Sequence, residues 1–543
     1  MKQFDLIVIG AGISGMAVAM RAIEAGMHVA LVDDHATVGE GASFFHSGVM
    51  LPPPLDPWFG PDAALPTPGG VPWRRSARER AADAQRHARL APLQPLIAQS
   101  ASRLEALARR YEIDFERRDG ALYAWRNATA FQRVKALIAE WPGASAATAA
   151  CAAPDPAAER DVPPATSDGT ADDTPTTAST PTTPPTPEAT SAAARIDLYG
   201  HTARILDAEA CRAMEPALEH AEALAGGVAF DGLSSGNAAV MAKRLKQCLD
   251  AADVRFLLAR EAIRIDVHGN GVDVSIRPAQ QAVGAFSGVQ ARGFMAPSTA
   301  PILGLDARQT DPAQHVEKIC GTNVVIAAGA GSAKLLGDMG IALPLQRVTR
   351  TTLTGTVLRE DYAPRHLLVD AENGAAIVRF DRRVRVSSCL YGQAATIGKV
   401  SRKGASLPPG PPAKALQALP AQLHRWRDSL VPGAARFDGP PGESVALVGA
   451  DGLPVIGTLR GRQTGGRLHL VLSGAHRGWG LAFGAADLLF AQWGHTVKSD
   501  GDENAHGTTE STTDVPAPVP VRDARDTFDS AARMALSPAR FGH

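Results

Sequence analysis

The stretch Leu6-Ile7-Val8-Ile9-Gly10-Ala11-Gly12-Ile13-Ser14-Gly15 decides the fold, because it joins an apolar strand to a glycine-rich turn and the start of a helix. A second apolar run, Val29-Ala30-Leu31-Val32, ends on Asp33. A G-x-G-x-x-G turn after a strand, followed by an acid about 20 residues later, is typical of a dinucleotide-binding βαβ unit. The pattern therefore predicts dinucleotide binding, against the alternative of an ordinary glycine-rich turn in an α/β domain.

Each small residue of this turn has an expected task. We expect Gly10 to permit the tight turn after the strand and Gly12 to let a pyrophosphate approach the helix N-terminus. Gly15 should let the helix pack closely on the strand, and Ser14 lies in the same turn as a further cofactor contact. Asp33 would hold a ribose hydroxyl.

Composition agrees with a large enzyme of two or more domains. Lysine and arginine number 55 against 56 acids, a formal net charge of −1, so nothing in the overall charge points to nucleic acid. The sequence contains no uninterrupted run of about 18 apolar residues, so we expect no membrane-spanning helix. The first apolar stretch is interpreted as a core strand rather than a signal peptide. The five cysteines lack C-x-x-C spacing, so we expect no metal site and a reducing, cytoplasmic compartment.

Three segments look like insertions into a globular core. They are residues 144–194, 278–314 and 498–531, each rich in small or polar residues and Pro. Such composition buries too little apolar surface to offset chain entropy, so we expect all three to be disordered. Helices are expected between Ala81 and Tyr111 and over Ala238–Ala252, because apolar residues recur there at helical spacing.

A second apolar strand far along the chain separates two classes of nucleotide enzyme. The run Asn323-Val324-Val325-Ile326-Ala327-Ala328-Gly329-Ala330-Gly331 ends in small residues, which lets the backbone close over a nucleotide bound at the first turn. Large FAD enzymes use such a distant strand, whereas NAD dehydrogenases usually keep the nucleotide fold contiguous. The sequence therefore favours FAD, with Gly329 among its contacts.

Further motifs follow in an order that resembles FAD-dependent D-amino acid oxidoreductases, with the closest likeness to bacterial D-amino acid dehydrogenase. Besides the opening turn and the strand ending at Gly329, they are Glu40–Gly48, Ile377–Val386, Asp451–Gly457, Ser473–Gly480 and the final Leu536–Phe541. The likeness spans nearly the whole core and skips only the three insertions.

The resemblance implies an α/β fold with two domains. A discontinuous, Rossmann-like FAD-binding domain would pair with a mixed-sheet α+β substrate domain. The FAD-binding parts are expected at 1–80, 228–277 with 315–342, and 442–497; the substrate parts at 81–143 with 195–227, and 343–441; and a tail at 532–543.

The resemblance also implies the reaction. Hydride would leave the α-carbon of a D-amino acid, or of a related secondary amine such as proline, hydroxyproline or sarcosine, for flavin N5, and the imine would hydrolyse to a keto acid and ammonia. Dehydrogenase members pass the electrons to a quinone or a carrier, which a peripheral contact with the inner face of the membrane would permit. Two alternatives stay open: a glycine- or sarcosine-type oxidase that uses oxygen, and a flavin-binding subunit or sensor without catalysis.

The resemblance places further residues at the cofactor, and one departure affects the substrate. The expected FAD contacts from the later motifs are Ser43, His46, Gly478, Trp479 and Gly480. Ala446 stands where the family carries an arginine that pairs with the substrate carboxylate, an interaction that neutral residues reproduce poorly. A relocated anchor is therefore needed. Candidates are Arg347, Arg350, Arg379 and Arg477, and we select Arg350 and Arg379, with His476 as a flavin-side residue.

His46 has two interpretations. In some sarcosine and dimethylglycine dehydrogenases a histidine in this region carries the flavin covalently, but their spacing to the following glycine is one residue longer than in His46-Ser47-Gly48. The other interpretation, which we prefer, is a histidine hydrogen-bonded near the ring without a covalent link.

Overall fold

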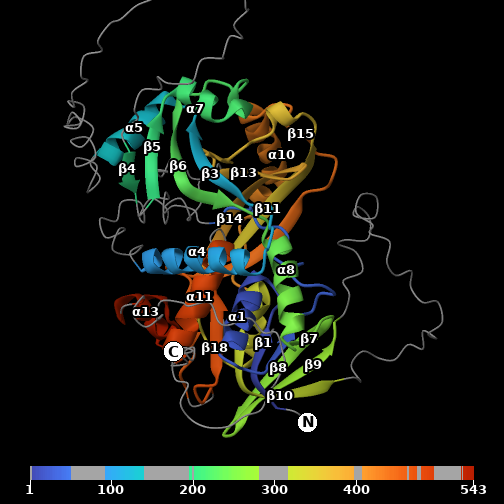
Figure 1. Ribbon diagram of the computed structural model, residues 1–543. Coiled ribbons are helices and arrows are strands. Elements are labelled where there is room, and N and C mark those ends of the chain that lie inside the picture. The colour runs from blue at the N-terminus through green and yellow to red at the C-terminus, as the bar shows by residue number, and fades with distance from the viewer. Residues whose placement is uncertain are drawn as a thin grey trace, which may run out of the picture.

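The computed structural model describes residues 3–50, 92–139, 195–198, 201–279, 316–396, 407–461, 464–473, 478–493, 528 and 530–542. Nearly all of the three expected insertions, and residues 81–91 of the expected helical region, lie outside these ranges. The described chain folds around two β-sheets, drawn one above the other in Figure 1. This arrangement is an α/β fold with mixed sheets, as predicted.

The first sheet has eight strands and is built from four distant parts of the chain. Its main path runs β17-β18-β10-β1-β2-β7, and the hairpin β8–β9 joins it through β9 and β10. The pairs β18–β10, β10–β1, β1–β2 and β2–β7 are parallel. The strands are β1 (Phe4–Ile9), β2 (Val29–Val32), β7 (Arg255–Leu257), β8 (Arg260–His268), β9 (Gly271–Pro278), β10 (Glu317–Ile326), β17 (Val455–Thr458) and β18 (Leu468–Leu472).

Strand β1 is apolar and buried from Leu6 to Ile9 because both faces of this sheet are covered there. Leu6 and Val8 pack into one hydrophobic cluster, and Ile7 and Ile9 pack into another on the opposite face. Successive side chains of a strand point to opposite faces, so a central strand covered on both sides carries a continuous apolar run. The unbroken run Leu6–Ile9 is the sequence signature of this central position.

Helices cover one face of the first sheet. They are α1 (Ile13–Glu24), α4 (Leu93–Arg110), α8 (Ala238–Ala251) and α11 (Gly478–Trp493). Buried residues of all four belong to the same cluster as Leu6 and Val8. The opposite face is covered by the β8–β9 hairpin and α9 (Ser332–Asp338). The expected helix over 238–252 is therefore confirmed, and α4 confirms the described part of the region 81–111.

The second sheet has ten strands and is mostly antiparallel. Its path runs β15-β11-β14-β13-β12-β3-β6-β5-β4, and β16 pairs with β11. The strands are β3 (Arg118–Trp125), β4 (Arg195–Leu198), β5 (His201–Leu206), β6 (Gly226–Ser235), β11 (Pro344–Val357), β12 (Leu367–Asp370), β13 (Ala375–Phe380), β14 (Arg383–Thr396), β15 (Ala435–Arg436) and β16 (Gly442–Gly449).

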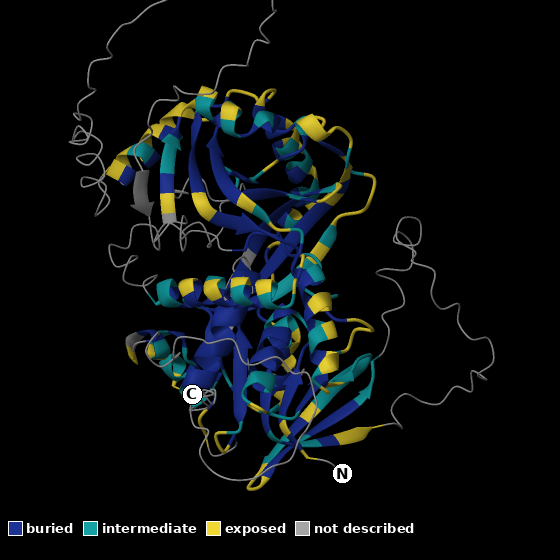
Figure 2. Cartoon of the chain, in the orientation of Figure 1, coloured by how far each residue is buried: buried dark blue, intermediate teal, exposed yellow. Residues whose placement is uncertain are grey.

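The two faces of the second sheet meet different neighbours. Tyr123 and Val378 pack into the cluster that contains α1, α4 and α11, so their face points toward the first sheet. Leu122 and Ile377, each one residue earlier, pack against the long helix α10 (Ala413–Leu430) on the other face. Figure 2 shows the strands of both sheets mostly buried where these layers meet, and α4 with buried residues alternating with intermediate and exposed ones. We call the face of Tyr123 and Val378 the inner face.

Sheet membership differs from the predicted domain boundaries in three places. The strands β6, expected from residue 228 in the FAD-binding part, and β16, expected there from residue 442, both pair within the second sheet. Helix α4, expected in the substrate domain, packs against α11 of the first sheet. A boundary drawn from local sequence cannot see pairing partners that lie far along the chain.

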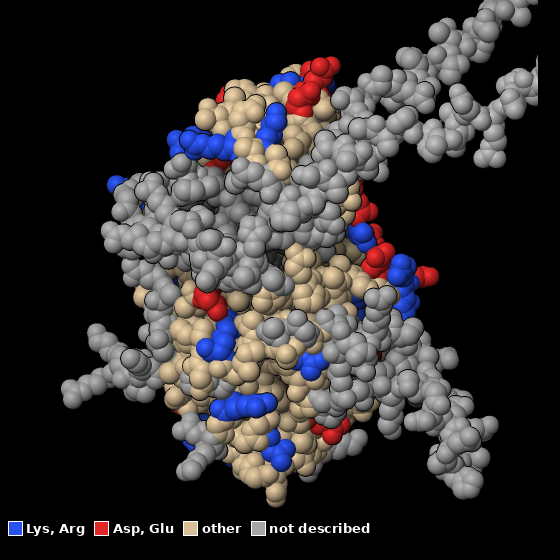
Figure 3. Space-filling model, turned by 90° about the vertical axis from the view of Figure 1, so that its left-hand side faces the viewer, with Lys and Arg blue, Asp and Glu red and all other residues tan. Residues whose placement is uncertain are grey.

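The described surface carries both signs of charge. On the side of the molecule drawn in Figure 3, basic and acidic side chains occur in small groups, some of them with both signs, among uncharged ones. Within the described ranges, no helix is both long and apolar enough to cross a membrane.

A buried charged network holds three helices of the first sheet together. The Asp487 carboxylate on α11 accepts a hydrogen bond from Gln99 Nε2 of α4 (2.7 Å) and forms an ion pair with Arg21 Nε of α1 (3.2 Å). Arg103 of α4 pairs with Glu24 of α1, and its Nε lies 3.8 Å from Asp487 Oδ1. Burial lowers the pKa of Arg103, and the Asp487 carboxylate opposes that shift.

Replacing Asp487 with Asn should lower the free energy of unfolding by about 3 kcal/mol, since it leaves two buried arginines without their shared carboxylate. Denaturant unfolding followed by circular dichroism measures this change. Glu105→Gln, which breaks an exposed pair with Arg109 on α4, is the matched control and should cost less than about 1 kcal/mol. Equal losses in both variants would contradict a stabilising role for the network.

Candidate active site

Two glycines set the approach of α1 to the first sheet. Gly10 has a φ of +112°, and a Cβ there would lie 2.5 Å from the carbonyl oxygen of Ala327, the residue that follows the neighbouring strand β10. A Cβ on Gly15 would lie 1.8 Å from the Gly10 carbonyl oxygen. Neither position has room for a side chain, so the start of α1 is drawn against the carboxyl edge of the parallel strands.

The N-terminus of α1 suits an anion. Its N-cap residue is Gly12, which has no side chain to cap the helix, and the first turn holds no acidic residue. Unpaired N–H groups and the helix dipole favour negative charge at such an end. Ser43 Oγ accepts a hydrogen bond from the Ile13 N–H (3.0 Å), and Ser14 Oγ lies 2.8 Å from Ser473 Oγ at the end of β18. The residues present therefore fit the diphosphate of a dinucleotide.

Asp33 follows β2 at the same edge of the sheet. Its Oδ2 accepts a hydrogen bond from the Ala11 N–H (2.5 Å), and its Oδ1 accepts one from the His35 N–H (2.8 Å). The side chain is only partly exposed, and these bonds hold it beside the glycine turn. A carboxylate fixed here is placed to accept from ribose hydroxyls.

His35 lies between two carboxylates at the rim of this edge. Its Nδ1 is 2.9 Å from Asp33 Oδ1 and 2.8 Å from Asp34 Oδ1. Hydrogen bonds to Asp33 and then Asp34 raise the pKa of His35 to about 10, against the opposing effect of burial. The imidazolium therefore persists at neutral pH and offsets part of the acidic charge beside the nucleotide edge.

The segment 43–48 passes between the two sheets and is held by a buried arginine. Arg385 of β14 donates from Nη1 to the carbonyl oxygens of Phe44 (2.9 Å) and His46 (2.8 Å). His46 is 5% exposed, and its Nδ1 accepts a hydrogen bond from the Gly48 N–H (3.1 Å). Because that nitrogen accepts, the proton of the neutral ring resides on Nε2.

Gly48 brings this segment against the inner face of the second sheet. It has a φ of +87°, and a Cβ there would lie 2.4 Å from Phe380 and 3.2 Å from Val378. Val378 is paired with Arg385 on the neighbouring strand, so the two share a face. The inner face of the second sheet therefore borders the segment that leads from the nucleotide edge.

Strand register separates the two predicted substrate arginines. On β11, Arg350 lies four residues before Thr354, which pairs with Arg385, so Arg350 is on the inner face and is 3% exposed. Arg379 lies between Val378 and Phe380 and therefore points to the other face of β13. Its guanidinium pairs with Glu360 and donates to the Asp381 carbonyl oxygen. The structure thus brings Arg350, and not Arg379, toward the candidate site.

The remaining predicted residues divide in the same way. Gly329 follows β10 and has a φ of +54° at the carboxyl edge of the first sheet. Gly478 and Gly480 lie in the first turn of α11. Trp479 is fully buried with its ring edge-on to Phe115, 5.7 Å between centroids, so its side chain packs in the core. His476 and Arg477 lie outside the described residues.

Arg385 and Ser473 were missed as site residues by the sequence interpretation. The alternation Arg383-Val384-Arg385-Val386 shows that alternate residues of β14 share a face, but it does not show which face meets the nucleotide. Only the pairing with Val378 settles that question. Ser473 belongs to the motif Ser473–Gly480, but its partner Ser14 lies 459 residues earlier in the chain, so their contact cannot be seen in the local sequence.

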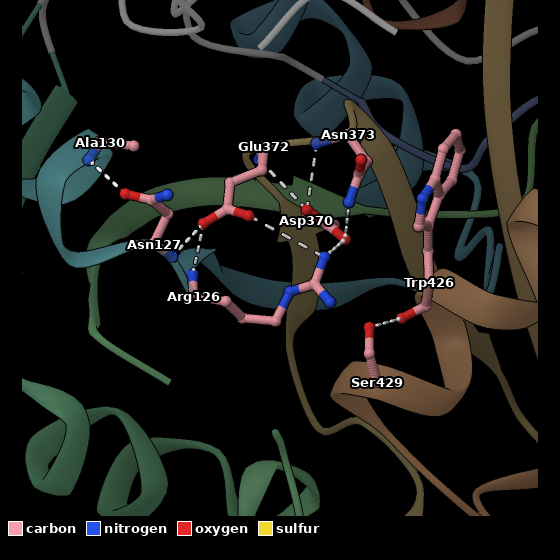
Figure 4. A network of polar contacts seen from close by, with 8 residues as sticks. All are labelled: Arg126, Asn127, Ala130, Asp370, Glu372, Asn373, Trp426 and Ser429. Atoms are coloured by element: carbon pink, nitrogen blue, oxygen red, sulfur yellow. Dashed lines mark hydrogen bonds and ion pairs between the residues drawn. The ribbon is translucent and has the colours of Figure 1, made fainter. Parts of the chain in front are cut away.

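A separate hollow of about 620 Å³ lies on the opposite side of the second sheet, against α10. Figure 4 shows its polar wall, where Asp370 accepts from Arg126 Nη2 (3.1 Å) and from Asn373 Nδ2 (2.8 Å). Trp426 lines one side of the hollow and packs in the hydrophobic cluster on the face of the second sheet opposite the inner face. Because the inner face points away from it, this hollow is not the candidate active site.

Comparison with known proteins identifies the class. The family model of FAD dependent oxidoreductases (DAO) matches residues 5–493. The chain therefore belongs to this family of FAD-dependent oxidoreductases, and its cofactor is FAD.

Among curated proteins, the chain is similar to D-amino acid dehydrogenases. It is 27% identical over 192 residues to the enzyme of Neisseria gonorrhoeae, covering 35% of this chain and 37% of that protein. It is 26% identical over 289 residues to that of Rhizorhabdus wittichii, covering 52% and 55%. The chain thus matches between about a third and about half of the length of these relatives.

Solved structures share the fold. Glycine oxidase from Geobacillus kaustophilus superposes with a TM-score of 0.52 at 17% identity, covering 90% of this chain and 94% of that chain. L-Amino acid deaminase from Proteus myxofaciens superposes with a TM-score of 0.53 at 14% identity, covering 91% of each. The predicted resemblance and its FAD-dependent class are confirmed.

The pKa of His35 gives a prediction for the rim of the site. A pKa raised from 6.5 to about 10 adds stability that is complete below pH 6.5 and is lost as pH rises through about 10. NMR titration, with His35→Gln to identify the resonance, should find this imidazole still protonated at pH 8. The stability difference between the wild type and His35→Gln should shrink between pH 7 and pH 10. A resonance that titrates near pH 6.5 would contradict the geometry.

Proposed function

We propose that this FAD-dependent oxidoreductase oxidises the C–N bond of a D-amino acid or a related secondary amine, and that Arg350 anchors the substrate carboxylate. The observation that carries the proposal is the place of Arg350 on the inner face of the second sheet. The substrate would lie between this face and the flavin, with the first sheet as a Rossmann-like FAD-binding domain and the second as the substrate domain.

Arg350 lies beside the position of the expected family arginine. Ala446 pairs with Val348 across β16 and β11, and Arg350 pairs with Ser444 in the same register. Ala446 and Arg350 are therefore diagonal neighbours on one face, a separation that a long side chain can span. A guanidinium from β11 can thus replace one from β16, with the same planar pair of hydrogen bonds to a carboxylate.

The other arginines fit this role less well. Arg379 is engaged with Glu360 on the other side of its strand. The Arg347 guanidinium lies beside Gly410 in the segment that precedes α10. The immediate surroundings of Arg350 include Cys389, which pairs with it across β14 and whose thiol pKa is raised by burial.

Bound FAD supplies the two-electron oxidant that accepts hydride from the amine-bearing carbon. The chain would hold the cofactor through Gly10, Gly12, Ser14, Gly15 and Asp33 at the nucleotide edge. Ser43, His46, Gly329 and the first turn of α11, Gly478–Gly480, would complete the binding set. The buried inner face would orient the substrate, and water would hydrolyse the imine after its release.

Electron transfer to a quinone or a carrier is the preferred second half-reaction, because the curated relatives are dehydrogenases. A peripheral contact with a membrane would suffice for it. A flavin-binding protein without catalysis is the second candidate, and Ala446 in place of an arginine is the observation that favours it.

Anaerobic mixing with a panel of amines tests the reaction. We expect the flavin band at about 450 nm to bleach with one class among D-amino acids, proline analogues and sarcosine, and not with the L-enantiomers of open-chain amino acids. Peroxide formation in air would identify an oxidase. A yellow protein that no member of the panel bleaches would place the non-catalytic candidate first.

Arg350→Met should lower kcat/KM by about 100-fold, because it removes one partner of a buried charged pair with the substrate. Arg379→Met is the matched control and should leave kcat/KM within about twofold, since that side chain faces Glu360. Stopped-flow reduction of the flavin measures both. A large loss in Arg379→Met with none in Arg350→Met would reverse the assignment.

A further inference from the structure

We propose that Arg540 is a positioning residue of the flavin site, acting through Asp451 on the turn that connects the two sheets. The proposal rests on the proposed function, because the turn 450–454 stands beside the end of β18, at the edge where that function places FAD. It adds residues 536–541 to the machinery of the site, although Arg540 itself would not touch the cofactor.

The contact between Arg540 and Asp451 is bidentate. Arg540 Nε lies 2.7 Å from Asp451 Oδ2, and Nη2 lies 3.2 Å from Oδ1. Nη2 also donates to the Leu453 carbonyl oxygen at 3.3 Å. The Arg540 side chain is only 11% exposed, and paired N–H donors on a carboxylate fix orientation as well as distance.

Asp451 in turn fixes the shape of its own turn. Its Oδ1 accepts a hydrogen bond from the Leu453 N–H at 3.0 Å, and Gly452 between them has a φ of +83°. The Gly449 N–H closes the turn on the Leu453 carbonyl oxygen at 3.0 Å. One carboxylate therefore receives both the guanidinium and the backbone of the turn.

The turn lies where the two halves of the site meet. It leaves β16 of the second sheet at Gly449 and enters β17 of the first sheet at Val455. Val455 pairs with Leu472, so the turn stands beside the end of β18, where Ser473 contacts Ser14 of α1. The Ala450 N–H bonds to the Pro344 carbonyl oxygen at the start of β11, the strand of Arg350.

Two glycines leave the space in which Arg540 and its segment lie. A Cβ on Gly449 would lie 2.6 Å from Arg540 Nη2, and a Cβ on Gly457 would lie 3.1 Å from Pro538. Ser537 Oγ caps the short helix η6 (Pro538–Phe541) by accepting from the Ala539 N–H, and Arg540 Nη1 donates to the Ser537 carbonyl oxygen. The segment is thus ordered locally and docked on the turn.

A displaced turn would change two distances at once. It would move the inner face that carries Arg350 and Ala446 relative to the nucleotide edge, and it would move the backbone beside the flavin. Loss of Arg540 should therefore weaken FAD binding and substrate binding more than it weakens the fold.

The test compares Arg540→Ala, Arg540→Lys, Asp451→Asn and the double variant Asp451→Asn/Arg540→Ala with the wild type. Arg436→Ala is the control, since Arg436 on β15 forms an exposed ion pair with Asp438 that this variant removes. For each, the FAD dissociation constant, the visible circular dichroism of the bound flavin, KM, kcat and the melting temperature of the holoprotein are measured.

We expect Arg540→Ala to raise the FAD dissociation constant about tenfold and to alter the visible circular dichroism, with Arg540→Lys restoring part of both. The double variant should be no worse than the worse single variant, because the two residues act through one contact. Arg436→Ala should match the wild type.

Two results would overturn the proposal. One is an Arg540→Ala protein with wild-type FAD affinity, spectrum and KM, which leaves the proposed function intact. The other is a variant with a lower melting temperature but an unchanged flavin environment, which would make the contact purely structural. A wild type that binds no FAD would instead overturn the proposed function, and this inference with it.

Discussion

The seating of α1 against the first sheet is the constraint on which the rest of the site depends. The Gly15 backbone meets the Gly10 carbonyl, and Gly10 meets the carbonyl of Ala327, directly after β10, at distances that exclude any side chain. The helix start is therefore fixed relative to two strands that are about 300 residues apart in the chain. Ser43, Asp33 and Ser473 reach the same edge by hydrogen bonds to residues 11–14, so three further segments take their positions from it.

Two arginines fix the second sheet relative to this edge of the first sheet. Arg385 holds the carbonyl groups of segment 44–46 from β14, and Arg540 holds the turn after β16. The first contact lies at the segment that leaves the nucleotide edge, and the second at a return of the chain to the first sheet. Hydrogen bonds from a guanidinium to fixed oxygens are directional, so both contacts set orientation where apolar packing alone would allow sliding.

The sequence predicted the elements of the first sheet better than the membership of the second. The apolar runs at 6–9, 29–32 and 323–326 and the glycine turn carry local signals, and each forms a strand or turn as expected. The strands β6 and β16 carry no local signal of their partners, and pairing with β3 and β11 places both in the second sheet. For the site, residue type identified Arg350 and Arg379 equally, and only strand parity and register distinguish them.

The inner face has an electrostatic character that local sequence could not show. Burial, together with the nearby charges of Arg383 and then Arg350, lowers the pKa of Arg385 to about 9, and the Glu116 carboxylate opposes this shift. The guanidinium therefore stays charged at neutral pH, although burial disfavours its charged form. Arg350 adds a second buried guanidinium to the same face. Positive charge in a poorly solvated layer favours an anion bound beside it. The replacement of the expected arginine by Ala446 therefore leaves the face cationic, because the charge is supplied by neighbouring strands.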